Sequence, residues 1–139
     1  MKDIKSSEGY MDLTPYDAMK NITRQDKAEK VFRPLVYICS PYRGDVEENT
    51  KVARKFCRFV TDKGQIPVAP HLLFPQFMDE ETERELALFM GIILMGKCQE
   101  VWVLGEKVTE GMSAEIEKAN QRRQKVRYFN AEFEEVQKV

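Results

Sequence analysis

The sequence is poor in the residues that build metal sites. It contains a single histidine, and its three cysteines, Cys39, Cys57 and Cys98, lack the close spacing that a zinc site requires. We therefore predict no metal site. An odd number of scattered cysteines is typical of free thiols that behave as small apolar residues in a reducing compartment.

Excess charge and long apolar runs are also missing. The chain has 22 basic and 23 acidic residues and a formal net charge of -1, which gives no electrostatic reason to expect a nucleic-acid or membrane partner. The longest apolar run, residues 86–95, is too short for a membrane span and contains Gly91. The amino terminus is charged and lacks the apolar core of a signal peptide, so the expected location is the cytoplasm.

The first part of the chain, residues 1–31, is predicted to be a helical appendage to an α/β domain that spans residues 32–139. Thr14-Pro15 is typical of a helix start, with threonine as the N-cap and proline in the first turn. The helix would carry few apolar residues, mainly Tyr16, Met19 and Ile22. Since so short an apolar stripe cannot stabilise a helix by itself, it must lie on the domain or on a second subunit. We expect a homodimer or a higher homo-oligomer.

Strand and helix patterns alternate through the rest of the chain. Strands are predicted at residues 34–39, 66–69, 100–105 and 125–129, and helices at residues 45–63, 79–97, 106–122 and 131–139. This alternation predicts a Rossmann- or flavodoxin-like three-layer sandwich with a parallel sheet of four or five strands. Pro67 places the second strand at an edge, which gives the order 2-1-3-4, extended by a fifth strand if there is one. The helix at residues 79–97 is apolar almost all round, so we expect it to be buried.

Glu115 breaks the pattern of the helix that follows the third strand. At 100° per residue, Met112, Ile116 and Ala119 fall on the face that packs on the sheet, and Glu115 lies within this apolar stripe. Ligands of open α/β sheets bind at the carboxyl ends of the strands, where this helix begins. Glu115 is therefore a candidate catalytic nucleophile. The alternative is a structural carboxylate at the edge of the stripe, held by an arginine or by backbone N–H groups.

A polar turn, Ser40-Pro41-Tyr42-Arg43-Gly44, follows the first strand and leads into a helix. Such a turn presents backbone N–H groups and a helix N-terminus to a ligand, which favours anions. The glycine and lysine spacing of a P-loop is absent. Arg43 would add a bidentate contact to a phosphate, or it is a surface arginine in a tight turn.

The apolar segment after the second strand also has two interpretations. Residues 72–78 form either a loop or one short helix, and they carry Phe74, Phe77 and Met78. These side chains would make an apolar wall for a flat ligand, or they cover the core. His71, just before them, has the same two interpretations.

Four short motifs occur at these positions in order: Cys39-Ser-Pro-Tyr-Arg-Gly44, Ala69-Pro-His71, Glu83-Arg-Glu-Leu86 and Gly111-Met-Ser-Ala-Glu115. Together they resemble the nucleoside 2-deoxyribosyltransferase superfamily, which includes the deoxynucleoside 5′-monophosphate N-glycosidases. The resemblance to small deoxyribosyltransferase-like proteins covers nearly the whole chain. The likeness to the characterised enzymes covers residues 34–129.

The resemblance implies roles for individual residues. Glu115 matches the nucleophile that attacks C1′ of the sugar, and Glu85 matches a catalytic aspartate, with one extra methylene here. Arg43 matches an arginine that contacts the 5′-phosphate in the nucleotide glycosidases, and His71 matches a histidine near the sugar–phosphate end. Thr109 stands where the transferases carry an aspartate and the nucleotide glycosidases a phosphate-binding serine, so its hydroxyl sides with the second group.

The other implied substrate-binding residues are Ser40, Tyr42, Gly44, Gly111 and Met112. The expected function is cleavage of the N-glycosidic bond of a nucleoside or its 5′-monophosphate, by hydrolysis or base transfer and without a cofactor. A carboxylate beside C1′ would stabilise the oxocarbenium-like state or form a glycosyl ester, while a second carboxyl group protonates the departing base. The alternative is a nucleotide-binding or regulatory module that has the pocket without turnover.

Overall fold

Residues 32–137 are described by a computed structural model, in which a five-stranded sheet forms the centre of an α/β fold. The strands are β1 Leu35–Cys39, β2 Ile66–Val68, β3 Glu100–Leu104, β4 Lys125–Phe129 and β5 Glu135–Val136. Their order is β2-β1-β3-β4-β5, and only the β4–β5 pair is antiparallel. The predicted strand order is confirmed, and β2, with Pro67, lies at an edge. The predicted appendage, residues 1–31, lies outside the described residues.

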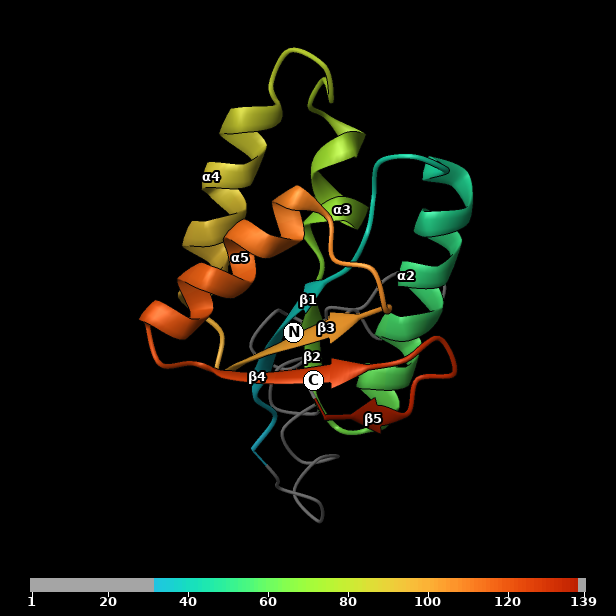
Figure 1. Cartoon of the computed structure of the whole chain (residues 1–139), viewed down its shortest axis with the longest axis vertical. Helices are drawn as coiled ribbons and strands as arrows, with labels where there is room; N and C mark the ends of the chain where they lie inside the picture. Colours follow the sequence, from blue (N-terminus) through green and yellow to red (C-terminus); the bar gives the residue numbers. More distant parts are fainter. Residues whose placement is uncertain (1–31, 138–139) are drawn as a thin grey trace, which may run out of the picture. The chain divides into compact units, whose positions relative to one another are not determined.

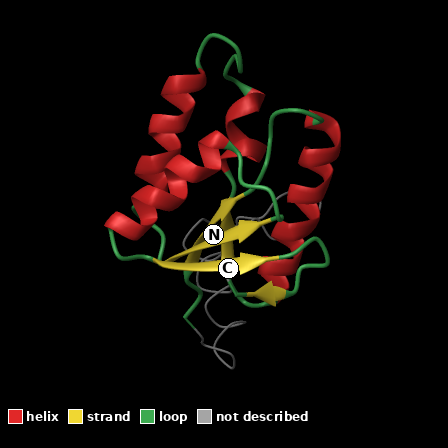
Figure 2. Ribbon diagram, in the orientation of Figure 1, coloured by secondary structure: helices red, strands yellow, loops and turns green. Residues whose placement is uncertain are grey.

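The helices lie on both faces of the sheet. They are α2 Val46–Asp62, α3 Pro70–Leu73, the 3-10 helix η2 Phe74–Gln76, α4 Arg84–Met95 and α5 Glu110–Gln121. α2 covers one face, and α4 and α5 lie together on the other, as Figures 1 and 2 show. The three-layer prediction is therefore confirmed. Within residues 32–137, no helix is long and apolar enough to cross a membrane.

Strand β1 supplies side chains to two separate cores. Val36 and Ile38 point to one face of the sheet and Tyr37 and Cys39 to the other, because successive side chains of a strand alternate. The core under α2, here called the aromatic cluster, consists of Val36, Ile38, Phe56, Val60, Trp102, Leu104 and Phe129. The core under α4 and α5, here called the sulfur cluster, consists of Tyr37, Cys39, Met95, Cys98, Val101, Val103, Met112, Ile116 and Ala119.

Helix α4 is shorter than the predicted helix at residues 79–97. The Asp79 carboxylate accepts hydrogen bonds from the backbone N–H groups of Glu81 and Thr82, and this turn occupies the residues before the helix. An aspartate that binds the backbone two and three residues ahead competes with helical hydrogen bonding. The helix therefore begins at Arg84.

The prediction that this helix is buried was wrong. Leu86, Phe89 and Ile93 keep 48%, 62% and 47% of their surface exposed. Only the side of α4 that meets the sheet and α5 is covered, and Gly91 and Met95 are its buried residues. An all-apolar sequence indicates that a helix is covered, but the cover need not come from the same chain.

The predicted terminal helix at residues 131–139 was also wrong. The Asn130 side-chain oxygen accepts two backbone N–H groups of the following turn, and Phe133 takes a left-handed conformation with φ of 63°. The chain reverses there and adds β5 to the sheet. Arg127 then binds the Glu135 carboxylate through Nε and Nη2, at 2.9 and 2.7 Å. A turn closed by asparagine and followed by a paired strand leaves no residues for a helix.

Candidate active site

A cavity of about 120 Å³ opens at the carboxyl ends of β1 and β3, the neighbouring strands at which the sheet order reverses. Its walls come from the turn after β1, from α3 and η2, from the start of α4 and from the start of α5. The residues singled out in the sequence that line it are Tyr42, Arg43, His71, Thr109, Gly111, Met112 and Glu115. Segments far apart in the sequence thus meet in one place.

Glu115 lies at the inner end of this cavity. Only 5% of its surface is exposed, and its helix neighbours Met112, Ile116 and Ala119 are buried with it, as the apolar stripe predicted. The Tyr37 hydroxyl on β1 donates a hydrogen bond to Oε2 of Glu115. Among the described residues, no arginine and no backbone N–H group is bonded to this carboxylate.

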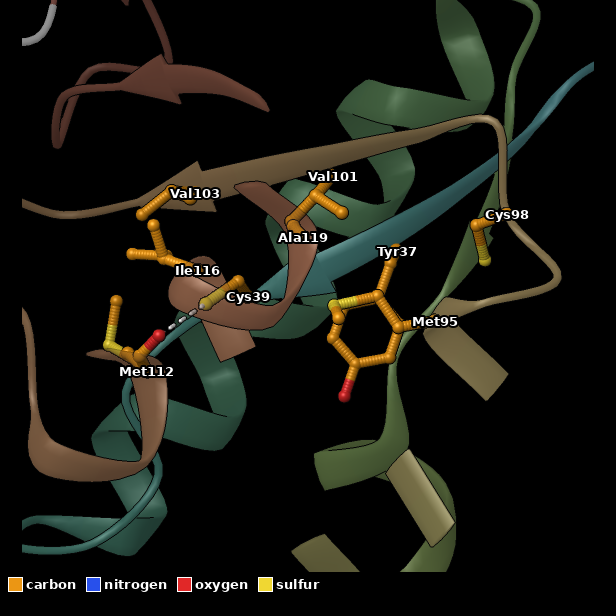
Figure 3. Close-up of a cluster of buried hydrophobic side chains, with 9 residues drawn as sticks. All are labelled: Tyr37, Cys39, Met95, Cys98, Val101, Val103, Met112, Ile116 and Ala119. Carbon is orange, nitrogen blue, oxygen red and sulfur yellow. Dashed lines mark hydrogen bonds between the residues drawn. The ribbon is translucent and has the colours of Figure 1, made fainter. Parts of the chain in front are cut away.

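The surroundings of Glu115 come from β1. Figure 3 shows the Tyr37 ring and the Cys39 thiol projecting from β1 among the side chains of the sulfur cluster, and the thiol is 3.8 Å from the carbonyl oxygen of Met112. Burial raises the pKa of the Glu115 carboxyl, while the hydrogen bond from Tyr37 and the neighbouring Cys39 thiol act in the opposite direction. Burial and the Glu115 charge both raise the pKa of Tyr37 and of Cys39. Both groups therefore stay protonated. The Tyr37 hydroxyl donates to the Glu115 carboxylate, and the Cys39 thiol donates to the carbonyl oxygen of Met112.

Gly91 on α4 leaves room for this arrangement. A methyl group at this position would be 2.8 Å from the Tyr37 hydroxyl oxygen and 3.7 Å from Oε2 of Glu115. A glycine inside a helix lowers helix stability by about 1 kcal/mol relative to alanine, so its presence needs a packing reason. The close approach of α4 to the Tyr37–Glu115 pair supplies that reason.

One wall of the cavity is aromatic. The rings of Tyr42 and His71 stack with centroids 5.0 Å apart and an angle of 15° between their planes. Burial lowers the pKa of His71, so its imidazole is neutral at pH 7. Phe74 and Met78 also line the cavity, whereas Phe77 is 64% exposed and does not. The wall can thus take the flat face of a ligand.

Two predicted residues of the first turn lie outside the cavity wall. Ser40 is buried at the end of β1, where 3% of its surface is exposed. Gly44 adopts a φ of 98°, which only glycine tolerates readily. The side chain of Asn49 donates to the carbonyl oxygens of Tyr42 and Arg43, 3.1 Å from each. The turn is therefore held by its own backbone geometry and by one asparagine.

Thr109 is the N-cap of α5, and its hydroxyl oxygen accepts the backbone N–H of Met112 at 3.2 Å. The acceptor role fixes the direction of the side chain, and the hydroxyl proton is left to donate to a ligand in the cavity. The N-terminus of α2 differs from the expectation of an anion site. Its N-cap is Asp45, and its first turn carries Glu47 and Glu48.

Glu85, the predicted second carboxyl group, is exposed and does not line the cavity, whereas its neighbour Arg84 does. One residue along a helix turns a side chain by about 100°, which places the two on different sides of α4. The acidic residues at the rim are instead Asp79 and Glu80. The sequence analysis did not identify Asp79 and Glu80 as site residues. Acidic residues before a helix are also explained by their favourable interaction with the helix dipole.

The described residues include no group of three or more histidine, cysteine, aspartate or glutamate side chains placed to hold a metal ion. The polar side chains that line the cavity carry carboxylates, guanidinium groups, the hydroxyls of Tyr42 and Thr109, and one neutral imidazole. This set suits a polar organic ligand, with a carboxylate inside and cations at the mouth.

A family model described as a domain of unknown function, DUF7768, matches residues 34–129. The chain belongs to the DUF7768 family. The DUF7768 match runs from the residue before β1 to the end of β4, so it contains every residue that lines the cavity. A comparison with curated proteins found no match.

Proposed function

We propose that the protein cleaves the N-glycosidic bond of a (deoxy)nucleoside or its 5′-monophosphate, with Glu115 as the nucleophile. The observation that carries this proposal is the position of Glu115: a buried carboxylate, bonded to Tyr37, at the inner end of a cavity at the strand ends. Burying a carboxylate is costly, and its pKa is raised as a result. Carboxylates kept in such surroundings are concentrated in functional sites.

The chemistry needs a carboxylate at this depth. When the bond between C1′ and the base nitrogen breaks, its electron pair leaves with the base and positive charge develops on the sugar. Glu115 would stabilise that charge or bond to C1′ as an ester, which water or a second base then displaces. The effect of one negative charge is larger in a buried site than in water. The stacked Tyr42–His71 pair would face a flat part of the ligand.

The departing base needs a proton from a second group. Glu85 matches the expected acid by sequence, but its exposed side chain would have to move to reach the cavity. Asp79 also lines the cavity, but the backbone N–H groups of Thr82 and Glu81 bind its carboxylate and lower its pKa, so it suits a proton donor poorly. Glu80 is paired with Arg43, at the end of the cavity proposed for the phosphate. If Glu85 is the donor, kcat for Glu85→Gln should fall most with a poorly leaving base, and an unchanged kcat would exclude it.

At the 5′ end of the substrate, Arg43 and Thr109 favour a phosphate. A hydrogen bond between charged groups contributes about 1.5–3 kcal/mol. Arg43→Ala should therefore weaken the binding of a 5′-monophosphate by roughly 10- to 100-fold and leave the binding of the nucleoside nearly unchanged. Thr109→Asp should reverse the preference, because a carboxylate repels phosphate and accepts a bond from a free 5′-hydroxyl. Equal kcat/KM values of the parent protein for both ligands would contradict the phosphate assignment.

The test of the activity is release of free base from a panel of nucleosides and 5′-monophosphates, with Glu115→Gln as the key variant. Tyr37 can still donate to the amide oxygen, so the fold should persist while turnover falls by at least about 10³-fold. Glu117→Gln is the matched control, because Glu117 is an exposed carboxylate on the same helix. A Glu115→Gln variant with the parent rate would show that Glu115 is structural.

A non-catalytic nucleotide-binding module is the second candidate. It is favoured by the position of Glu85, since the cavity lacks the second carboxylate where the resemblance places it. Calorimetry separates the two functions. Binding of a 5′-monophosphate without any release of base would support the binding module.

We also propose that the chain forms a homo-oligomer through α4. Its exposed residues Leu86, Phe89 and Ile93 are spaced i, i+3 and i+7, so they form one apolar stripe. The same stripe on two chains can pair around a twofold axis. Light scattering at micromolar concentration should show at least a dimer, and Phe89→Glu should dissociate it. Val46→Glu, at an exposed valine of α2, is the control.

A further inference from the structure

An ion pair crosses the mouth of the cavity. Nε of Arg43 lies 3.2 Å from Oε2 of Glu80, and both residues line the cavity. The pair connects the turn after β1 to the segment between η2 and α4. The two side chains are 50% and 35% exposed, so the pair is in contact with solvent and can exchange partners.

The backbone on each side of the pair is held in place. On the first side, Asn49 binds the carbonyl oxygens of Tyr42 and Arg43. On the other, the Asp79 carboxylate accepts two backbone N–H groups, and the backbone N–H of Asp79 donates to the Glu83 carboxylate at 2.9 Å. Only the two side chains are then free to move. The turn around Asp79 keeps the Glu80 carboxylate in front of Arg43.

The Glu80 carboxylate therefore lies at the Nε edge of the guanidinium group, which is one of the edges that a phosphate would use. Carboxylate and phosphate oxygens bind the same planar set of donors, so they exclude each other from one face of an arginine. Arg84 also lines the cavity, and it forms no ion pair with any of the described residues. Within the described part of the chain, a phosphate at the mouth would thus meet Arg84, which has no ion-pair partner there, and Arg43, which Glu80 already neutralises.

The size of the cavity also indicates that the ion pair must separate before a nucleotide binds. About 120 Å³ is less than the roughly 300–1,000 Å³ of common small-molecule sites. A whole nucleotide requires more room at the mouth than the cavity has while the pair is closed. Separation of Arg43 from Glu80 is the change that needs no backbone movement.

We propose that Glu80 is a specificity-determining residue that competes with the 5′-phosphate of the ligand for Arg43. This inference rests on the proposed function only for the substrate class, a nucleoside 5′-monophosphate. Because of Glu80, an anion needs a higher binding free energy to reach Arg43. A phosphate that also contacts Arg84 and Thr109 displaces the carboxylate, whereas a simple anion at Arg43 alone does so poorly. The pair therefore lowers the affinity for a simple anion and for the nucleotide by a similar factor, and only the nucleotide has further contacts that keep it bound.

The test measures binding by calorimetry in the full chain carrying Glu115→Gln, so that turnover does not interfere. The ligands are inorganic phosphate, a nucleoside and its 5′-monophosphate. Glu80→Gln should tighten both phosphate-bearing ligands by roughly 3- to 10-fold, since loss of the exposed pair and of one repulsive charge each change affinity a few-fold. The nucleoside should change less than about 2-fold.

Glu81→Gln is the matched control. It removes the same charge one residue away, from an exposed side chain that does not line the cavity. At physiological salt this change should alter phosphate affinity by less than about 2-fold, because the charge of an exposed side chain without contact to Arg43 is weakened by solvent and salt. Equal effects of Glu80→Gln and Glu81→Gln would overturn the inference, as would weaker phosphate binding in Glu80→Gln.

A double-mutant cycle isolates the competition. In an Arg43→Ala background, the gain from Glu80→Gln should fall to the level of Glu81→Gln, because there is no arginine left to release. An undiminished gain would mean that Glu80 acts by general repulsion, and the inference would be wrong. An absence of phosphate binding in every variant would also overturn it.

The base-release assay separates this inference from the proposed activity. If no base is released from any substrate but the calorimetric pattern holds, the competition stands and the glycosidase proposal fails. If base is released and Glu80→Gln behaves like Glu81→Gln, the activity stands and the competition fails.

Discussion

The two faces of the sheet are built differently although they share the same strands. The aromatic cluster under α2 consists of aliphatic and aromatic side chains, and Phe56 packs there against Phe59, Trp102, Phe129 and Phe133. The sulfur cluster on the other face contains a phenol hydroxyl and two thiols, and Glu115 is buried beside it. One face is therefore a conventional core, and the other combines a core with a polar site.

This difference shows where a fold can hold a buried charge. The side-chain donor of the aromatic cluster, the indole N–H of Trp102, already binds the Glu100 carboxylate at 2.8 Å. A further carboxylate buried in this cluster would lack that partner and would be strongly destabilising. On the opposite face, Tyr37 donates to Glu115, and Gly91 makes room for the pair. Both faces bury a core, and the alternation of β1 places the site on only one of them.

The largest expected effect on the free energy of unfolding comes from a substitution in the aromatic cluster, on the face of the sheet opposite the site. Phe56→Ala should destabilise the protein by about 3–5 kcal/mol, because Phe56 is fully buried among aromatic rings and its loss leaves a cavity. Chemical denaturation measures the loss. At a temperature where the variant is folded, its kcat should match that of the parent. A fall in kcat as steep as that of the site variants would show that the two faces are not separable.

An intermediate effect should appear at Gly91. Gly91→Ala places a methyl group against the Tyr37 hydroxyl, so the phenol must shift from Glu115 and kcat should fall roughly 10-fold. Stability should change little, since alanine favours the helix by about 1 kcal/mol and offsets part of the clash. The control is Gly96→Ala at the C-cap of α4, where the new methyl group would meet the flexible end of Arg122 and, at 3.4 Å, the carbonyl oxygen of Ile93, neither of which belongs to the Tyr37–Glu115 pair. Equal kcat values for both variants would contradict the positioning role.

Tyr37→Phe provides a second readout for the same pair. The hydrogen bond from Tyr37 lowers the pKa of Glu115, so its loss should raise that pKa further. Since the nucleophile must be ionised, the acid limb of the pH–rate profile should move to higher pH. A profile that keeps its position while kcat falls would mean that Tyr37 acts in another way.

The smallest effect concerns stability at the site itself. Burial raises the pKa of Glu115 in the folded protein, so the folded state binds this proton more tightly than the unfolded state. Stability from this group is present below the unfolded pKa and declines as pH rises through the folded pKa. Relative to Glu115→Gln, the parent should be most stable at acidic pH and lose that advantage towards neutral pH. Thermal melts from pH 4 to pH 8 measure this, and the opposite slope would contradict the raised pKa.

The strands and the site stripe could be predicted because they depend on local periodicity. Apolar runs located β1 and β3, Pro67 placed β2 at an edge, and the 3.6-residue period put Glu115 among Met112, Ile116 and Ala119. These features depend on which face of a strand or helix is buried. The spacing of apolar residues in a single sequence indicates that face directly.

Other features could not be predicted because they depend on contacts between distant segments. Tyr37 lies in a continuous apolar run, and nothing in that run shows that its hydroxyl meets a carboxylate on α5. The need for glycine at position 91 becomes visible only in the structure, where α4 lies close to Tyr37 on β1. Glu85 and Arg84 differ by one residue, and the start of α4 decides which of them lines the cavity. The terminal helix was wrong because the Asn130 side chain closes a turn that propensity does not reveal.

The pairing of β1 has a consequence for folding during synthesis. Val36 pairs with Glu100, and Leu35 with Ile66, so β1 stays incomplete until β3 has left the ribosome. Contacts of such long range form slowly, and an apolar strand that waits unpaired is open to aggregation. The β4–β5 hairpin, by contrast, joins near neighbours. Because Tyr37 lies on β1, the nascent chain acquires the surroundings of Glu115 only when β1 is paired with both β2 and β3.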